Sequence, residues 1–177
     1  MATGDGGDPG DQRQGPGQAD RLSPRERLTV RLVLLSPADR LLLLNFDDGR
    51  YAGWCTVGGG VDKGESLIEA ARRELLEETG HAEAHFGPVV WRRWHDMVVE
   101  GEDRRLVESY FIVRVEHERL SDHGWTPLER QIVKAMRWWS LDEIAASDQA
   151  IYPGGLAGHL AKLLAGDIPD QPITIGA

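Results

Sequence analysis

The amino-acid sequence predicts an α/β (α+β) fold, a sandwich in which helices cover a mixed β-sheet. Short apolar runs typical of strands alternate with stretches that carry helix-capping residues. The chain has 177 residues, which fits one domain and leaves no room for two ordinary ones. Hydrophobic residues make up 41% and charged residues 28%, as in a globular protein that buries its own core. Strands and helices mixed in this order indicate an α/β or α+β sandwich.

Residues 1–25 are expected to form a disordered tail. Six glycines and two prolines fall in the first 20 positions, with almost no apolar side chains to bury. This stretch is polar, so the sequence predicts no signal peptide. The domain is expected over residues 26–168, and residues 169–177 are expected to form a C-terminal tail.

The first strands are predicted from two apolar runs, residues 28–35 and 41–46. Between them lies Ser36-Pro37-Ala38-Asp39, which is turn chemistry, so a hairpin is expected. A short strand over residues 54–57 runs into Gly58-Gly59-Gly60. Further strands are expected over residues 89–99, 106–115 and 134–139.

The strongest predicted helix covers residues 66–79. Ser66 and Glu69 form the pattern of a capping box, and Gly80 is typical of a helix end. Further helices are expected from residue 141, after Ser140, and over residues 155–164.

Composition excludes several classes of function. The net charge is -9, and an acidic chain repels a polyphosphate backbone, so general nucleic-acid binding is disfavoured. The single cysteine, Cys55, excludes an internal disulfide and a Cys-based zinc site; it fits a reducing, cytoplasmic compartment and is expected to fill the core. No apolar stretch reaches the roughly 20 residues of a membrane span. No membrane partner is expected.

The predicted helix over residues 66–79 carries an acidic face. Glu74 lies three positions before Glu77 and four before Glu78, so the three carboxylates share one side. Like charges at this spacing cost a few tenths of a kcal/mol per pair, and a hard divalent cation such as Mg²⁺ or Mn²⁺ removes that cost. Arg73 can hold one carboxylate in place. The alternative is a solvated acidic face with a salt-bridging arginine.

The segment over residues 59–81 resembles the Nudix box, G-x5-E-x7-R-E-U-x-E-E-x-G-U, where U is aliphatic. The matching residues are Gly59, Glu65, Arg73, Glu74, Leu75, Glu77, Glu78 and Gly80. The last position departs from the pattern, because His81 stands where an aliphatic residue is usual. Residues 137–143 also look like the strand-to-helix ending of many Nudix domains. The resemblance to the MutT-like Nudix hydrolases implies an α/β/α sandwich around a mixed sheet.

The same resemblance implies the chemistry. The family hydrolyses pyrophosphate bonds in nucleoside diphosphates linked to another moiety, with Mg²⁺ or Mn²⁺ as cofactor. By position, Glu74 is the first choice for the general base, Arg73 would orient it, and Glu65 would pair with Arg73. The implied metal ligands are Glu74, Glu77 and Glu78, with a main-chain carbonyl from Gly59 or Gly60.

Glu108 is a further candidate. Strand alternation places it on a largely apolar face with Leu106 and Tyr110, where an acid needs a partner. Some Nudix enzymes bring an acid from a later strand to the metal, and Glu108 resembles such a ligand. The alternative is a strand-edge acid paired with Arg104 or Arg92.

Candidate substrate-binding residues combine aromatic and basic side chains. Arg50, Tyr51 and Trp54 precede the glycine loop, and Arg92 lies in a stretch that interleaves tryptophans with arginines. Aromatic rings can stack on a nucleobase and arginine can bind phosphate with two hydrogen bonds. The alternative for the tryptophans is packing in the core.

The predicted function is that of a Mg²⁺-dependent hydrolase acting on a small nucleotide or diphosphate, as a monomer or homodimer. ADP-ribose, a dinucleoside polyphosphate, a nucleotide sugar and an oxidised or ordinary nucleoside triphosphate all suit the site. Two alternatives stay open: a catalytically silent nucleotide-binding module and an isoprenoid-diphosphate isomerase. The complete set of box acids argues against the first. The second needs a catalytic cysteine, and Cys55 is the one candidate.

Overall fold

The computed structural model describes residues 25–99 and 101–176. The predicted N-terminal tail lies outside this range except for Arg25, which begins the first strand. No helix in the described part of the chain is long and apolar enough to cross a membrane.

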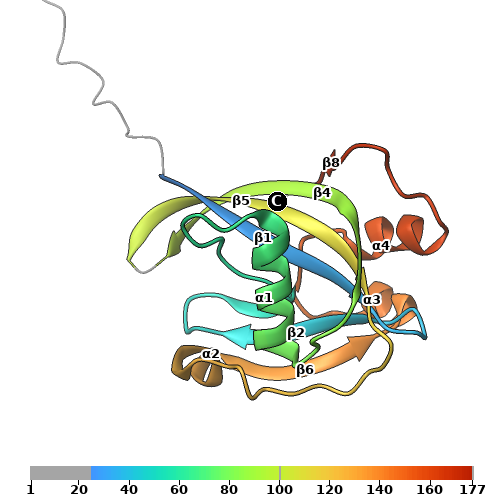
Figure 1. Ribbon diagram of the computed structural model, residues 1–177, viewed down its shortest axis with the longest axis horizontal. Helices are drawn as coiled ribbons and strands as arrows, with labels where there is room; N and C mark the ends of the chain where they lie inside the picture. Colours follow the sequence, from blue (N-terminus) through green and yellow to red (C-terminus); the bar gives the residue numbers. More distant parts are fainter. Residues whose placement is uncertain (1–24, 100, 177) are drawn as a thin grey trace, which may run out of the picture.

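One curled mixed sheet organises the described chain (Figure 1). Its strand order is β7-β3-β2-β1-β5-β4-β8, and β6 pairs with β2 beside this path. The strands are β1 (Arg25–Leu35), β2 (Leu41–Asp47), β3 (Ala52–Thr56), β4 (His85–Val99), β5 (Glu102–Arg114), β6 (Val133–Trp139), β7 (Ile151–Tyr152) and β8 (Ile173–Thr174). Because β1 runs parallel to β5 while β4 and β5 are antiparallel, the predicted mixed sheet is confirmed.

The helices form layers on the two faces of this sheet, as the predicted sandwich requires. They are α1 (Leu67–Thr79), α2 (Pro127–Ile132), α3 (Leu141–Ala146) and α4 (Leu156–Leu164). One core cluster packs α1, through Ala71 and Leu75, on inner strand residues such as Leu32. A second cluster joins α3 and α4, through Ile144 and Leu160, to the opposite face.

The predicted hairpin exists only at its turn. The Ser36 N–H donates to the Arg40 carbonyl at 2.9 Å, and β1 pairs with β2 only where Leu35 meets Leu41. Beyond that point β1 lies beside β5, and β2 lies between β3 and β6. Both runs are apolar on both faces, which suits strands buried inside a sheet better than a two-stranded ribbon.

The ends of α1 agree with the sequence prediction. The Glu69 N–H donates to the Ser66 hydroxyl, and the Ser66 N–H donates to the Glu69 carboxylate at 2.8 Å, which completes the capping box. Gly80 has a φ of 76°, and its N–H donates to the Leu76 carbonyl. These caps fix the start and end of the helix that carries the acidic face.

The short elements α2, β7 and β8 were not predicted from the sequence. Helix α2 begins after Thr126, which forms a capping box with Glu129 and is followed by Pro127 at the first helical position. This is the same signature that identified α1, so the sequence contained the signal for α2. Strands β7 and β8 have two residues each and carry no such signal.

The C-terminal segment packs on the domain, in contrast to the predicted tail. Strand β8 pairs with β4, and the Ile175 N–H donates to the Arg92 carbonyl at 2.9 Å. Ile175 is only 4% exposed and belongs to the core cluster around α4. One buried apolar side chain and backbone pairing with β4 thus hold a segment whose composition resembles a loop.

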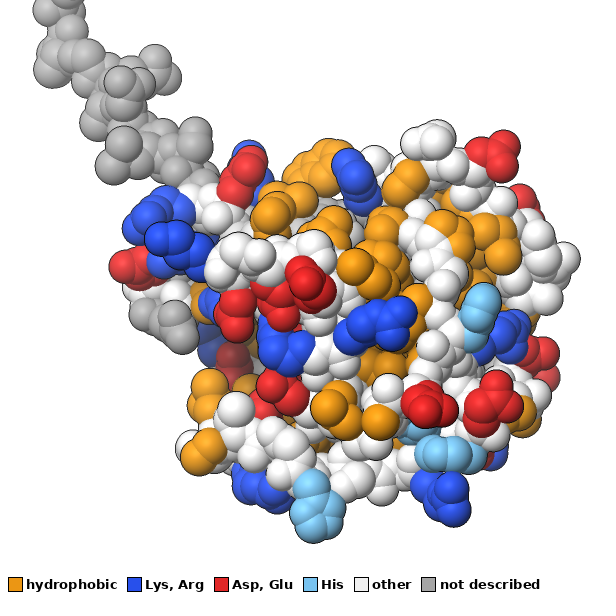
Figure 2. Space-filling model, viewed as in Figure 1, with side chains coloured by type: hydrophobic (Ala, Val, Ile, Leu, Met, Phe, Trp, Pro, Cys, Tyr) orange, Lys and Arg blue, Asp and Glu red, His pale blue; other side chains and the backbone are white. Residues whose placement is uncertain are grey.

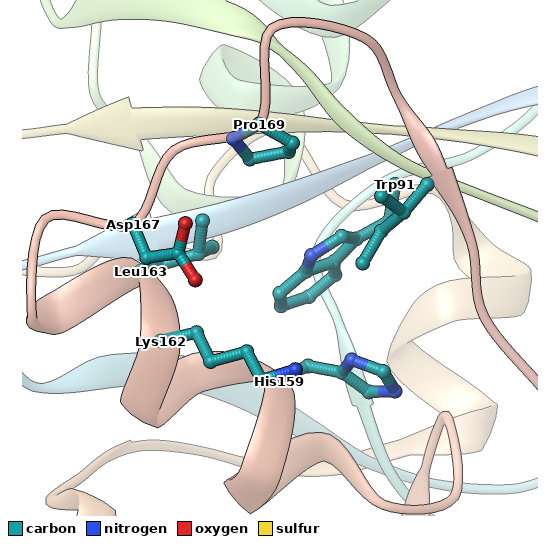
Figure 3. A pocket seen from close by; sticks show the side chains of 7 residues that line it. Trp91, His159, Lys162, Leu163, Asp167 and Pro169 are labelled. Carbon is teal, nitrogen blue, oxygen red and sulfur yellow. The ribbon is translucent and has the colours of Figure 1, made fainter.

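A small cavity of about 170 Å³ lies between α4 and this C-terminal segment (Figure 3). Trp91 and His159 both line it, and the centroids of their rings lie 5.6 Å apart. Lys162 and Asp167 are at its rim and are exposed. Its lining residues include none of the residues that the Nudix resemblance assigns to chemistry.

Shortening Ile175 tests whether the C-terminal segment supports the domain. Ile175→Ala is expected to destabilise the fold by about 2 kcal/mol, because it removes a buried side chain from the core. The melting temperature should fall by roughly 4–8 °C. Ile173→Ala is the matched control, because Ile173 lies in the same segment and is 39% exposed, against 4% for Ile175. Equal melting temperatures for the two variants would show that Ile175 contributes nothing.

Candidate active site

Arg73 on α1 gathers the acidic residues that the sequence singled out. Its Nη1 donates to Glu74 Oε1 at 2.7 Å and to Glu77 Oε2 at 3.2 Å. Its Nε and Nη2 donate to the two oxygens of Glu65, each at 2.9 Å, and Nη2 also donates to the Gly60 carbonyl at 2.8 Å. Figure 2 shows acidic and basic side chains beside one another over α1. The hydrogen bonds that Arg73 donates to Glu65 raise the pKa of Arg73, so this guanidinium stays charged.

The glycine loop lies directly against Glu74. A Cβ atom on Gly59 would stand 2.4 Å from Glu74 Oε1, so a side chain at position 59 would displace this carboxylate. Glu74 is buried, and burial raises its pKa, although the hydrogen bond from Arg73 offsets part of that shift. The loop therefore allows the backbone to approach a buried acid closely.

Glu78 is a buried acid whose negative charge is stabilised by few hydrogen bonds. It is buried, and its described hydrogen-bond donor is the Gly58 N–H, 2.6 Å from Oε2. Burial raises the pKa of Glu78 to about 8, and the neighbouring charge of Glu74 acts in the same direction. An ionised Glu78 is therefore costly unless a cation lies nearby.

The donor set fits a hard divalent cation. In the described part of the chain, no three His, Cys, Asp or Glu side chains converge closely enough to hold a metal ion, and the carboxylates of Glu74 and Glu77 are hydrogen-bonded to Arg73. All the candidate ligands are oxygens, which Mg²⁺ and Mn²⁺ prefer over nitrogen and sulfur. The raised pKa of Glu78 is the shift that a bound cation would reverse.

A cavity of about 450 Å³ opens beside Glu78. Aromatic side chains from Phe46, Tyr51 and Tyr152 contribute to its lining. Arg31, Arg93, His95, Glu108 and Tyr110 contribute polar groups from β1, β4 and β5. A cavity of this size with aromatic lining and a few polar groups suits a nucleotide-sized ligand.

Glu108 is the centre of a buried ion-pair network in this cavity. It is only 1% exposed; Arg31 Nε lies 3.0 Å from Oε1 and Arg93 Nη1 lies 3.0 Å from Oε2. The Tyr110 hydroxyl also donates to Oε2, at 2.8 Å. Burial acts to raise the pKa of Glu108, but Arg31, Tyr110 and Arg93 together hold it below its usual range.

The partners that the sequence suggested for Glu108 are wrong. Arg104 pairs with Glu102, and Arg92 is exposed on the opposite side of β4. The true partners are Arg31 on β1 and Arg93, one position beyond Arg92. Strand alternation already placed residues 91, 93 and 95 on one face, and Arg31 is a lone cation in an apolar run, so both signals were present in the sequence.

Of the four candidate substrate-binding residues, the cavity includes Tyr51. Arg50 is exposed, with its guanidinium 6.0 Å from the Tyr51 ring centre. Trp54 is buried in the core against Trp139, with ring centres 5.0 Å apart. Arg92 is exposed and is not among the residues that line the cavity.

A family model described as the NUDIX domain matches residues 25–156 of the chain. The chain belongs to the Nudix family. The match covers strands β1 to β7 of the sheet, the Nudix box on α1 and the residues that line the cavity described above.

Relatives with curated names cover part of this Nudix chain. An RNA pyrophosphohydrolase of Wolbachia pipientis subsp. Culex pipiens (strain wPip) is 30% identical over 126 residues, 58% of this chain and 66% of the relative. A putative 8-oxo-dGTP diphosphatase of Bacillus subtilis (strain 168) is 44% identical over 50 residues, 28% of this chain and 32% of the relative. The chain thus spans less than two thirds of the length of these relatives.

Solved structures share the fold. The MutT protein from Methanosarcina mazei Go1 aligns with a TM-score of 0.60 at 20% identity, covering 84% of this chain and 99% of that one. The α/β/α arrangement around a mixed sheet is therefore that of the Nudix fold.

His81, the departure from the Nudix box, is accommodated in the structure. Its side chain is buried, with Nδ1 2.9 Å from the Thr79 hydroxyl and Nε2 3.0 Å from the His117 carbonyl. Its ring stacks on the ring of His117 at 4.8 Å. Polar partners thus replace the apolar packing that an aliphatic residue would supply.

Cys55 packs against the core cluster around α1 and also lines the cavity. It is half-buried, and burial raises the pKa of its thiol to about 11. A thiol with so high a pKa is a poor nucleophile at neutral pH. This weakens the isomerase alternative that the sequence left open.

Proposed function

We propose that this protein is a Mg²⁺- or Mn²⁺-dependent pyrophosphohydrolase that cleaves a nucleoside diphosphate linked to another moiety. The observation that carries the proposal is the position of buried Glu78, which belongs to the α1 acidic face and also lines the nucleotide-sized cavity. The site for a cation and the site for a nucleotide therefore share one side chain.

The residues of the Nudix box have different proposed roles. Arg73 holds Glu74 in one rotamer and is held in turn by Glu65, so the acidic cluster is ordered before substrate binds. Glu74 is the proposed general base, because its raised pKa brings it closer to neutral pH, where a base accepts a proton most effectively. Glu74, Glu77 and Glu78 are the proposed ligands, with a carbonyl of Gly59 or Gly60.

A divalent cation held there would neutralise charge on the diphosphate and lower the pKa of a bound water. The same positive charge would allow an acidic protein to bind a phosphorylated substrate. Glu108 fits less well among the ligands, because both of its oxygens already accept hydrogen bonds from Arg31, Arg93 and Tyr110.

The names of the relatives define which substrates to test. They include an RNA pyrophosphohydrolase and a putative 8-oxo-dGTP diphosphatase, so RNA with a 5′-triphosphate and oxidised nucleotides belong in the panel. The net charge of -9 disfavours binding along an RNA backbone but not capture of a single phosphorylated end.

A substrate panel with a metal control tests the proposal. The full chain is incubated with nucleoside triphosphates, ADP-ribose, a dinucleoside polyphosphate, nucleotide sugars and 5′-triphosphate RNA, with Mg²⁺ or with excess chelator. Phosphate or nucleotide release is expected with Mg²⁺ and should disappear in chelator, because the acidic face then has no cation. Full turnover in chelator would contradict the metal requirement. Binding without release would instead favour a silent nucleotide-binding module.

A further inference from the structure

The cavity contains buried polar atoms that the protein leaves without partners. Among the described residues, three buried side-chain nitrogens have no hydrogen-bond partner: Arg93 Nε, His95 Nδ1 and Trp139 Nε1. The first two belong to residues that line the 450 Å³ cavity, and they lie two positions apart on β4, so they face the same side. A buried N–H without a partner costs free energy, which a ligand that accepts a hydrogen bond recovers.

The Arg93 side chain is held as a rigid fork. Its Nη1 donates to Glu108 Oε2 at 3.0 Å, and Glu108 is in turn held by Arg31 and Tyr110. No described residue accepts a hydrogen bond from Nε, and none accepts one from Nη2 on the same edge of the guanidinium. Two parallel donors on one planar edge match two acceptors that lie in one plane.

The charge around this fork also favours an acceptor. Arg31 and Arg93 supply two positive charges against the single negative charge of Glu108, whose oxygens are already occupied. The cavity lining also includes the carboxylates of Glu78, Asp96 and Glu129, so the excess of positive charge is confined to the contacts around Glu108. A group that brings an N–H donor to the free edge of Arg93 would place donor against donor, which is unfavourable.

We propose that Arg93 is a specificity-determining residue that recognises a coplanar pair of acceptors, so that the cavity prefers the 6-oxopurines guanine and hypoxanthine over adenine. This inference rests on the proposed nucleotide substrate. The O6 and N7 atoms of an oxopurine form such a pair, whereas adenine presents an amino donor beside N7. The aromatic rings of Phe46, Tyr51 and Tyr152 offer surfaces for the base.

A carboxylate or phosphate group presents the same pair of acceptors. The experiment therefore distinguishes binding of a purine base from binding of an anion. Binding of GMP, IMP, 7-deaza-GMP, AMP and inorganic phosphate to the full chain is measured by calorimetry. GMP and IMP are expected to bind about tenfold or more tightly than AMP. 7-Deaza-GMP, which lacks the N7 acceptor, should lose most of that advantage, and this comparison needs no protein variant.

Arg93→Lys keeps the positive charge and removes the planar fork, so its GMP-to-AMP affinity ratio should fall toward one. Arg114→Lys is the matched control, because Arg114 is exposed and pairs with Asp39 away from the cavity; its ratio should equal that of the parent. Melting curves show whether each variant is folded.

Three results would overturn the inference: equal affinity for GMP and AMP, undiminished binding of 7-deaza-GMP, or binding of inorganic phosphate as tight as GMP that weakens in Arg93→Lys. The last would assign the fork to an anion instead of a base. Because binding is measured without turnover, selective GMP binding by a protein that hydrolyses no member of the substrate panel contradicts only the proposed function.

Discussion

Replacing Glu78 by glutamine should lower turnover by a few orders of magnitude while leaving the protein folded. Glutamine keeps the size of the side chain but removes its charge and its strong oxygen ligand. Loss of a metal ligand removes several kcal/mol of transition-state stabilisation, and each 1.4 kcal/mol corresponds to about tenfold in rate. The measurement is the steady-state rate at saturating Mg²⁺.

The same variant should be at least as stable as the parent in chelator. Glu78 is buried with a raised pKa of about 8, so the folded protein holds a proton there that the unfolded chain releases. Stability from this group is therefore greatest below the ordinary glutamate pKa and is lost as the pH rises toward about 8. Glu78→Gln should remove this loss. Between about pH 5 and about pH 8, the melting temperature in chelator should therefore fall less for the variant than for the parent.

Glu83→Gln is the matched control for Glu78→Gln. Glu83 is exposed just beyond α1, so the same chemical change there should alter neither rate nor melting temperature. A Glu78→Gln protein that turns over its substrate within a few-fold of the parent would show that Glu78 is a structural acid and not a metal ligand.

Replacing Gly59 by alanine should lower turnover by about a hundredfold. The new Cβ would stand 2.4 Å from Glu74 Oε1 and 2.7 Å from Cδ, so the carboxylate has to move. Glu74 is buried and held by Arg73, and a shift of about 1 Å at a catalytic group costs on the order of a hundredfold in rate. The φ of Gly59 lies outside the left-handed region, so backbone strain plays no part.

Gly158→Ala is the control for Gly59→Ala. Gly158 lies in α4 with open space around its Cβ position, and alanine there should leave the rate unchanged and slightly raise the melting temperature. If Gly59→Ala retained the rate of the parent, the close approach between the glycine loop and Glu74 would have no catalytic role.

The sequence alone determined the layered α/β architecture and the acidic face of α1. Both depend on local rules: the Ser66 capping box starts the helix, Gly80 ends it, and helical periodicity places Glu74 beside Glu77 and Glu78. The predicted pairing of Arg73 with Glu65 is also present in the structure. Such contacts span at most two or three helical turns, so the residue spacing contains the necessary information.

The sequence pattern did not show which strands pair with one another. A strand shows which of its faces is buried but not which strand lies beside it, because that choice depends on contacts between distant segments. The predicted hairpin of β1 with β2 is limited to its turn, and the predicted C-terminal tail instead adds β8 beside β4.

Only the tertiary structure decided the cavity, for the same reason. The parallel register of β1 and β5 places Thr29 opposite Glu108 and brings Arg31 to Glu108 across 77 positions of sequence. Burial then makes Arg31 and Arg93 obligatory partners for that carboxylate, although Arg104 is much nearer to it in sequence than either of them. The sequence thus determined which helix carries the acids, and the pairing of distant strands decided which arginines face the cavity beside them.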